Sequence, residues 1–491
     1  MRGSVIVLGS DANALVAAHF IALADHAVTL FHERAVPDDG ALDAGWIPPQ
    51  IIRRLDLDRY GLRVHAADPW AVIPLADGDR LELARDVART AEAIRKVSPR
   101  DAAKWPEFCQ RMHALARLLE QVYTAPPPDP LTASASGLSE LTRSALRVRR
   151  LGASAMEDLF RLLPMSAADW LDEWFETDAL KGLLGAAAVM HLRQGPRSGG
   201  TAFNLLHHHV GSAAGVFRPA LSNVRAALGR RAEVAVRPGS VTRIDVREGR
   251  VAGVVLEDGQ AVAASAVVCA YTPAHTLLEL VDPGLLDPEL VRALRNIRSR
   301  GVAAEVALTL DREPTFTTLV IAPSLDYIER AYDDVKYGRV SAAPCIEARY
   351  VGPSAERDHR FSVQLHAQYV PHALRDGVWD TTQSEKLART LVSRVCDYVP
   401  GLADTVIEQR ILTPHDLEHI HGHPQGQPYQ AEMALDQVLW MRPVPELARY
   451  KTPIEGLYLC GPAMHPGGAI VGAAGANAAS IVLRDLKKRK T

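Results

Sequence analysis

The residues near the N-terminus have the types and spacing of a dinucleotide-binding turn. Gly9, Asp11 and Ala14 occupy the three positions of a GxGxxG-like motif, and Glu33 follows after the next apolar run. In such a turn the glycines let the backbone approach a pyrophosphate, and the helix N-terminus attracts its charge. The acid after the second strand bonds ribose hydroxyls. Gly9 and Glu33 are therefore candidate cofactor-binding residues.

Two substitutions in this turn bear on whether it binds a ligand. Alanine at the third position, Ala14, is an accepted variant because it still permits close helix–strand packing. Asp11 adds a Cβ and a negative charge where a pyrophosphate would approach. Its carboxylate could cap the helix and leave binding possible, or it could fill the phosphate site and prevent binding. Both alternatives stay open at this point.

A second candidate site lies near the C-terminus, in the turn that contains His465, Gly467 and Gly468. A buried apolar run at 456–460 precedes Gly461, and a helix of small residues is expected over 469–486. A strand that runs into a Gly-rich turn and such a helix lets a flat ligand lie against the backbone. The helix N-terminus would stabilise negative charge on that ligand.

Histidines are the other residues that could do chemistry. His419, His421 and His423 alternate, which on a strand would place them on one face. A polar loop is favoured over a metal site, because no carboxylate or cysteine accompanies them. No metal is predicted. His465 is a candidate catalytic residue, and the alternative is a packing or backbone-fixing role.

Simple elements must position these residues. A strand at 4–8, a helix at 14–24 and a strand at 27–31 form a βαβ unit. Three strands at 240–246, 251–256 and 261–269 are predicted to form a meander. A second region, with strands at 303–310 and 361–369 and a helix at 384–399, is expected to cover the first.

Composition limits the classes of protein that remain. The chain has 491 residues, 47% of them hydrophobic and 23% charged, which is typical of a folded chain of two or more domains. A net charge of −3 gives no footprint for nucleic acid. Five dispersed cysteines favour a reducing compartment, and the absence of a long apolar run favours a cytoplasmic protein. The basic end at 487–490 complements a helix dipole, with weak contact to an anionic membrane surface as the alternative.

Four longer segments resemble a known family, at residues 98–108, 321–344, 441–461 and 465–479. They read SPRDAAKWPEF, IAPSLDYIERAYDDVKYGRVSAAP, MRPVPELARYKTPIEGLYLCG and HPGGAIVGAAGANAA. With the opening βαβ unit, they resemble the phytoene-dehydrogenase-like flavoproteins, in the branch called pyridine nucleotide-disulfide oxidoreductase domain protein 2-like. The likeness covers nearly the whole chain.

The resemblance implies an α/β fold with bound FAD. A Rossmann-like FAD-binding domain with an inserted β meander would comprise 1–75, 205–275 and 440–491. A mixed α+β substrate or cap domain would comprise 76–204 and 276–439. It would shape an apolar pocket over the flavin. The cofactor-binding residues carried over by the resemblance are Gly9, Glu33, Gly461, Gly467, Gly468 and Gly472.

The resemblance also implies a function. It indicates an FAD-dependent oxidoreductase that transfers hydride from an apolar substrate, of the isoprenoid or lipid-like kind, to the flavin. The alternative is a catalytically inactive relative with a degenerate dinucleotide motif, which acts as a binding or partner subunit. Asp11 is the residue that discriminates between the two. No oligomeric state is predicted.

Overall fold

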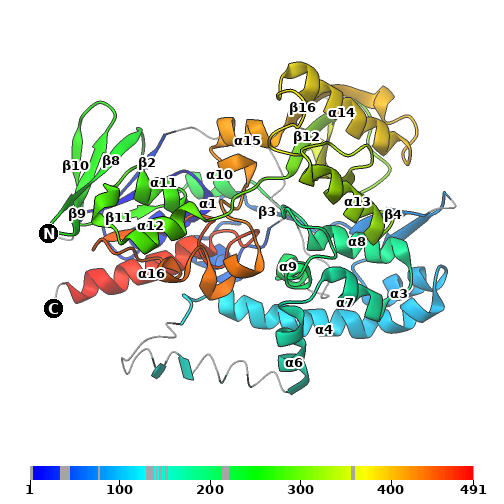
Figure 1. Cartoon of the computed structure of the whole chain (residues 1–491), viewed down its shortest axis with the longest axis horizontal. Coiled ribbons are helices and arrows are strands. Elements are labelled where there is room, and N and C mark those ends of the chain that lie inside the picture. The colour runs from blue at the N-terminus through cyan, green and yellow to red at the C-terminus, as the bar shows by residue number, and fades with distance from the viewer. Residues whose placement is uncertain are drawn as a thin grey trace.

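Two large sheets, two small sheets and a layer of helices make up the computed structural model of the chain (Figure 1). The structure describes residues 4–33, 45–75, 78–128, 153–212, 220–354 and 360–489, with a few positions between 138 and 149. A parallel sheet with the two terminal helices forms one side. The second sheet and the layer of helices form the other side.

The parallel sheet has five strands in the order β17-β11-β1-β2-β7. All four residues of β1 are buried, as expected of a central strand between two helical layers. Strand β1, helix α1 and strand β2 confirm the predicted βαβ unit. Their bounds are β1 (Val5–Leu8), α1 (Ala12–Ala22), β2 (Val28–His32), β7 (Ala235–Pro238), β11 (Ala266–Cys269) and β17 (Leu457–Leu459).

The last helix, α16 (Ala473–Lys488), packs directly on α1, so the two ends of the chain lie together. Small residues make this contact possible. A Cβ on Gly475 would stand 2.0 Å from the Asn13 carbonyl oxygen, and one on Gly472 would stand 2.9 Å from a methyl of Val16. The small-residue helix predicted near the C-terminus therefore serves close packing against the first helix.

The predicted meander is confirmed, with one correction. Strands β8 (Val241–Arg247), β9 (Arg250–Leu256) and β10 (Ala261–Ala263) pair in antiparallel fashion in the order β10-β9-β8. The third predicted strand, 261–269, is wrong as a single element, because its second half is β11 of the parallel sheet. The exposed residues of β10 end where the continuous buried run of β11 begins.

The second sheet has seven strands in the order β16-β12-β15-β14-β13-β4-β5. The strands predicted at 303–310 and 361–369 are β12 and β15, which pair antiparallel near its centre. The bounds are β4 (Ala71–Pro74), β5 (Arg80–Leu83), β12 (Ala303–Leu310), β13 (Thr318–Ile321), β14 (Cys345–Ser354), β15 (Arg360–Gln368) and β16 (Val406–Leu412). A small two-stranded sheet joins β3 (Arg63–His65) to β6 (Ala220–Ser222).

Helices cover both sheets and join them. The predicted helix at 384–399 is α14, which begins earlier than expected because Asp380 caps it. The remaining α-helices are α2 (Pro49–Leu55), α3 (Val87–Arg95), α4 (Pro99–Tyr123), α6 (Ala153–Leu162), α7 (Ala167–Trp174), α8 (Asp178–Ala188), α9 (Thr201–His208), α10 (Val224–Gly229), α11 (Pro273–Leu278), α12 (Pro288–Arg295), α13 (Leu325–Lys336), α14 (Thr381–Cys396) and α15 (Pro414–His421). Short 3-10 turns span Pro283–Leu285, Ala403–Thr405, Pro424–Gly426, Leu435–Gln437, Leu439–Met441 and Pro445–Leu447.

The predicted domain limits remain a prediction, and the packing refines how they can be drawn. Strand β4, which ends before residue 75, already belongs to the second sheet. Helix α12 packs into the core of the parallel sheet through Leu290 and Leu294. Near residues 75 and 275, therefore, the chain does not pass from one region to the other at the predicted limits.

The basic C-terminus is partly engaged with the protein. Arg489 donates to the Ser265 carbonyl at 2.9 Å and pairs with Glu455 at 2.9 Å, while Lys490 lies outside the described residues. Within the described part of the chain, no helix combines the length and apolar character needed to cross a bilayer.

Candidate functional site

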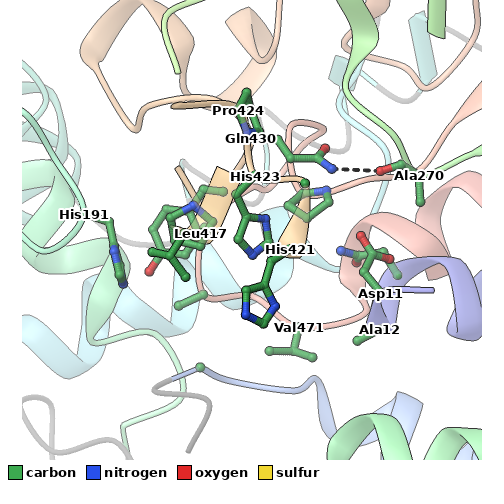
Figure 2. Close-up of a pocket in the computed structure, with 18 of the residues that line it drawn as sticks. Asp11, Ala12, His191, Ala270, Leu417, His421, His423, Pro424, Gln430 and Val471 are labelled. Carbon is green, nitrogen blue, oxygen red and sulfur yellow. Dashed lines mark hydrogen bonds between the residues drawn. The ribbon is translucent and has the colours of Figure 1, made fainter. Parts of the chain in front are cut away.

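One cavity of about 740 Å³ lies between the two sheets and reaches both of them. Figure 2 shows Asp11 on one side and His191 on the other, with His421 and His423 between them. We call the side with Asp11 the nucleotide end and the side with His191 the sheet end. Residues from the N-terminal turn, the C-terminal turn and four strands of the second sheet therefore line the same space.

The nucleotide end is formed by the N-terminal turn and the end of β2. Gly9 and Glu33 both line the cavity there. Gly9 has φ +119°, and a Cβ at this position would stand 2.9 Å from the Cβ of Ala270. Since L side chains rarely adopt this backbone conformation, the turn requires glycine.

Asp11 also lines the nucleotide end, and it caps α1. Its Oδ1 accepts a hydrogen bond from the Ala14 N–H at 2.7 Å. Burial raises the pKa of this carboxyl to about 6, although the Ala14 and Asn13 backbone groups and Arg225 favour its charged form. Asp11 thus caps the helix, as one of the two alternatives from the sequence has it, and it also lines the cavity, so whether it prevents binding of a phosphate stays open. Arg225, from α10, lines the same end and supplies a positive charge.

The C-terminal turn contributes part of the wall through Pro462 and residues 468–471. Gly468 has φ +52°, and a Cβ there would stand 2.5 Å from Nε2 of His207. Three other predicted cofactor residues lie behind this wall. A Cβ on Gly461 would meet the Ala270 carbonyl oxygen at 2.2 Å, one on Gly467 would meet the Arg442 guanidinium, and Gly472 caps α16.

His465 is fully buried behind the wall rather than in it. Its Nε2 and Nδ1 lie 3.2 Å from the Val122 carbonyl oxygen and 3.3 Å from that of Leu439. Burial lowers its pKa to about 4, so the ring is neutral near pH 7. These contacts are those of a ring that fixes the backbone of the turn, which is the alternative weighed for His465 from the sequence.

Arg442 is hydrogen-bonded to the C-terminal turn, and the sequence analysis did not identify it. Its side chain is fully buried, and its two terminal nitrogens donate to five backbone carbonyls at 3.0–3.1 Å. One of these belongs to Pro462 in the cavity wall. Burial lowers the pKa of the guanidinium to about 9, and the carbonyls bind its two terminal nitrogens in place of a carboxylate, while its buried Nε has no hydrogen-bond partner among the described residues.

The sheet end is built from side chains on one face of the second sheet. His366 on β15 lies directly between Glu305 on β12 and Glu347 on β14 in the strand register. Gln364 and Arg349 occupy the next row on the same face, because side chains two positions apart in a strand point the same way. All five line the cavity.

These side chains form a connected polar network. His366 Nδ1 donates to Glu305 Oε1 at 2.7 Å, and its Nε2 lies 3.3 Å from the Gln368 side-chain oxygen. Gln364 donates to the other oxygen of Glu305 at 3.4 Å, and Arg349 pairs with Glu347. Burial opposes the charged form of His366, but Glu305 and Glu347 outweigh it and raise its pKa.

This network gives the cavity one polar face, and the expectation of an apolar pocket stays a prediction. The polar residues alternate with buried apolar ones along β12, β14 and β15, and the strand pairing brings five of them together on the face that lines the cavity. The alternation is visible in the sequence. Its meaning depends on which strands pair and in what register, which the sequence does not state.

The histidines at the end of α15 reach the cavity from a helix end and not from a strand. The favoured polar loop is wrong for His419 and His421, which lie in α15, and the alternative of a strand is wrong as well, while His423 follows the helix. His421 and His423 line the cavity with their rings stacked at 5.9 Å. Burial lowers the pKa of His423 to about 4. A helix with a Thr413 capping box and a left-handed Gly422 at its end explains the placement.

One group of residues offers the ligand types of a metal site. Among the described residues, His191, Glu305 and His366 bring ligand atoms within 4.8 Å of one another. However, both oxygens of Glu305 and both nitrogens of His366 already take part in hydrogen bonds. Two of its three members, Glu305 and His366, are therefore already engaged, and we do not assign a metal to the group.

The residues at the nucleotide end fit the ADP part of a flavin dinucleotide. The glycine at position 9, the N-terminus of α1 and Glu33 are the parts that such a site requires, and Arg225 offsets the charge of Asp11. The parallel sheet, the inserted meander and the covering sheet together define the class of Rossmann-like flavoproteins.

Comparison with known proteins gives the family. The family described as flavin containing amine oxidoreductase matches residues 47–483, and the chain belongs to this family of FAD-dependent oxidoreductases. The chain is 30% identical to pyridine nucleotide-disulfide oxidoreductase domain-containing protein 2 of Rattus norvegicus, over 98% of this chain and 93% of that protein. A phytoene desaturase (lycopene-forming) of Pseudescherichia vulneris is 35% identical over 18% of each chain. The predicted resemblance is confirmed.

Solved structures share the fold. Cyclohexylamine oxidase from Brevibacterium oxydans superposes with a TM-score of 0.56 at 13% identity, over 100% of both chains. A redesigned putrescine oxidase gives a TM-score of 0.60 at 12% identity, over 100% of this chain and 99% of that one. The predicted α/β fold, with a Rossmann-like sheet and a mixed second sheet, is confirmed by this likeness.

Proposed function

We propose that this protein binds FAD in the cavity and oxidises a small molecule at the sheet end. The observation that carries the proposal is the continuity of the cavity, which joins a dinucleotide-binding turn, a glycine turn and a polar sheet face. The family supplies the cofactor class. When bound, FAD supplies an acceptor for hydride.

Different residues of the chain would bind the different parts of FAD and the substrate. Gly9 and the N-terminus of α1 would receive the diphosphate, Glu33 the adenosine ribose, and Arg225 would balance the diphosphate charge. Gly468 and the following residues would hold the flavin ring with their backbone, because they line the cavity and a Cβ at position 468 would displace the wall by meeting His207 behind it. The polar network on β12, β14 and β15 would bind and orient the substrate.

A second candidate rests on Asp11. A carboxylate that lines the diphosphate position repels a bound dinucleotide whenever it is charged. If this repulsion prevails, the protein keeps the fold without the cofactor and acts as a binding or partner subunit. The cap to Ala14 and the neighbouring Arg225 favour the first candidate.

Reconstitution distinguishes the two candidates. The full-length protein is incubated with FAD, desalted, and its visible absorption spectrum recorded at pH 6 and pH 8. The proposal expects flavin bands near one per chain, and tighter retention in Asp11→Asn than in the wild type at pH 8. Asp86→Asn, at the exposed N-cap of α3, is the matched control and leaves retention unchanged. A folded but colourless wild-type protein at both pH values contradicts the proposal and supports the partner subunit.

A further inference from the structure

Strand β16 forms one edge of the seven-stranded sheet, and its outer side is open. It pairs antiparallel with β12 and is the first strand in the sheet order (Figure 1). Apart from this pairing, residues 406–412 make no backbone hydrogen bond within the described part of the chain. Since alternate N–H and C=O groups of an edge strand point away from its neighbour, β16 presents unpaired backbone donors and acceptors.

Other strands at sheet edges are short or covered. Strands β5 and β7 have four residues each, and β7 ends in Pro238, which has no N–H to donate. Strand β8 has seven residues, but the Ile244 N–H on its outer side donates to the Leu280 carbonyl at 2.7 Å. Strand β16 also has seven residues, and none of the described residues covers it in this way. A long open edge of this kind is a template for pairing with another strand.

The side chains at the centre of β16 are available to a partner. Ile407, Glu408, Gln409 and Arg410 are all exposed, Ile407 to 50%. Glu408 and Arg410 lie on the same face of the strand, because they are two positions apart. Among the described residues, neither side chain has an ion-pair or hydrogen-bond partner. The open edge therefore carries one free carboxylate and one free guanidinium.

A second copy of β16 has the complementary charges in the required places. When two such strands pair antiparallel about a two-fold axis at Gln409, Glu408 of each chain lies directly opposite Arg410 of the partner subunit. Ile407 then lies opposite Ile411 of the partner subunit. Residues directly opposite each other have Cβ atoms about 4.5–5.5 Å apart, which is close enough for an ion pair. An axis at any other residue of β16 removes both ion pairs, so the charges define the register.

We propose that the chain forms a two-fold dimer in which two copies of β16 join their sheets edge to edge. This inference does not depend on the flavin chemistry proposed above. A pair of seven-residue strands is small beside the buried area of about 1,200–2,000 Å² of a stable interface. Association is therefore weak and depends on protein concentration. Strand β16 ends at Leu412, which lines the cavity, so the interface adjoins the cavity wall.

Charge reversal tests the interface in the full-length protein. Sedimentation equilibrium over a series of protein concentrations measures the dissociation constant of the dimer. Glu408→Arg places two like charges opposite each other in each pair, and Arg410→Glu does the same with the opposite sign. Each variant alone is expected to weaken self-association about tenfold or more. Mixing the two variants, or combining both substitutions in one chain, restores both ion pairs and therefore the dimer.

Glu257→Arg is the matched control. Glu257 is exposed in the turn between β9 and β10, so its reversal changes the net charge equally and leaves association unchanged. Cross-linking gives a second measurement. Under mild oxidation, Gln409→Cys is expected to form a disulfide across the two-fold axis, whereas Val236→Cys, exposed on β7, is not.

Three results overturn the inference. The first is a wild-type protein that stays monomeric at every concentration. The second is a dimer whose dissociation constant neither charge reversal changes, or a mixture of the two variants that associates no better than each variant alone. The third is a dimer that does not cross-link through Gln409→Cys. None of these results bears on flavin retention, which tests the proposed function separately.

Discussion

The two ends of the cavity are built in different ways. The nucleotide end is formed mainly by backbone, with Gly9 in a conformation that excludes a side chain and a helix N-terminus beside it. The sheet end is formed by side chains that meet across three strands, with His366 between Glu305 and Glu347. A site formed by backbone can be predicted from the glycines in its sequence. A site formed by side chains on several strands can be predicted only when the strand pairing is known.

At the nucleotide end, we expect the largest effect from a substitution at the contact between the first and last helices. Gly475→Val would drive side-chain atoms into the Asn13 carbonyl, which a Cβ alone already approaches to 2.0 Å. We expect a loss of about 3 kcal/mol or more in the free energy of unfolding, since the backbone of α1 must move. Chemical denaturation measures the loss. Gly229→Val, where a Cβ meets nothing within 4 Å, is the control, and an equal loss in both variants would contradict the packing account.

The turn at Gly9 gives the next effect. Gly9→Ala places a Cβ at φ +119° against Ala270, so we expect a loss of about 2 kcal/mol together with weaker FAD retention. Gly249→Ala also has a positive φ, +73°, but an open surrounding. It should cost about 1 kcal/mol and leave FAD retention unchanged. Equal FAD retention in the two variants would mean that the turn at Gly9 does not bind the cofactor.

The sheet end is tested by removing one charge from its network. Because its pKa is raised in the folded protein, His366 stabilises the fold below the ordinary imidazole value near 6.5, and this contribution is lost as pH rises through the folded pKa. Glu305→Gln should therefore cost about 1–2 kcal/mol at pH 6 and less at pH 9. Thermal melts at both pH values measure the difference. A cost that does not depend on pH would mean that the pair contributes only packing.

Asp11 gives the smallest effect, and it has the opposite sign. Its pKa of about 6 exceeds the unfolded value of 3.8, so the folded protein binds the proton more tightly and the wild type loses stability as pH rises through 6. Asp11→Asn keeps a cap and should be about 1 kcal/mol more stable than the wild type at pH 8, with no difference at pH 4. Denaturant titrations of this variant and of Asp86→Asn check the sign. A destabilised Asp11→Asn at pH 8 would contradict the assigned cost of the charge.

The two ends of the cavity also differ in how much of their structure could be predicted from the sequence. The βαβ unit, the meander and the glycine turns were predictable because each is local, and the break between β10 and β11 was missed because one apolar run spans both. His191 and Arg442 left no local signal. The first depends on two glutamines far along the chain, and the second on five carbonyls that only the folded turn brings together. Gly461, Gly467 and Gly472 were predicted to bind the cofactor but lie behind the cavity wall. A glycine motif can therefore shape the wall of a cavity without lining it.

The flavin content of two variants tests the division of the cavity most directly. Gly468→Val and His191→Gln are incubated with FAD, desalted, checked for folding by circular dichroism, and measured by visible absorption. The account predicts that folded Gly468→Val is colourless and that His191→Gln retains flavin like the wild type. Flavin retained by Gly468→Val, or lost from His191→Gln, would contradict the separation of a cofactor-binding end from a substrate-binding end.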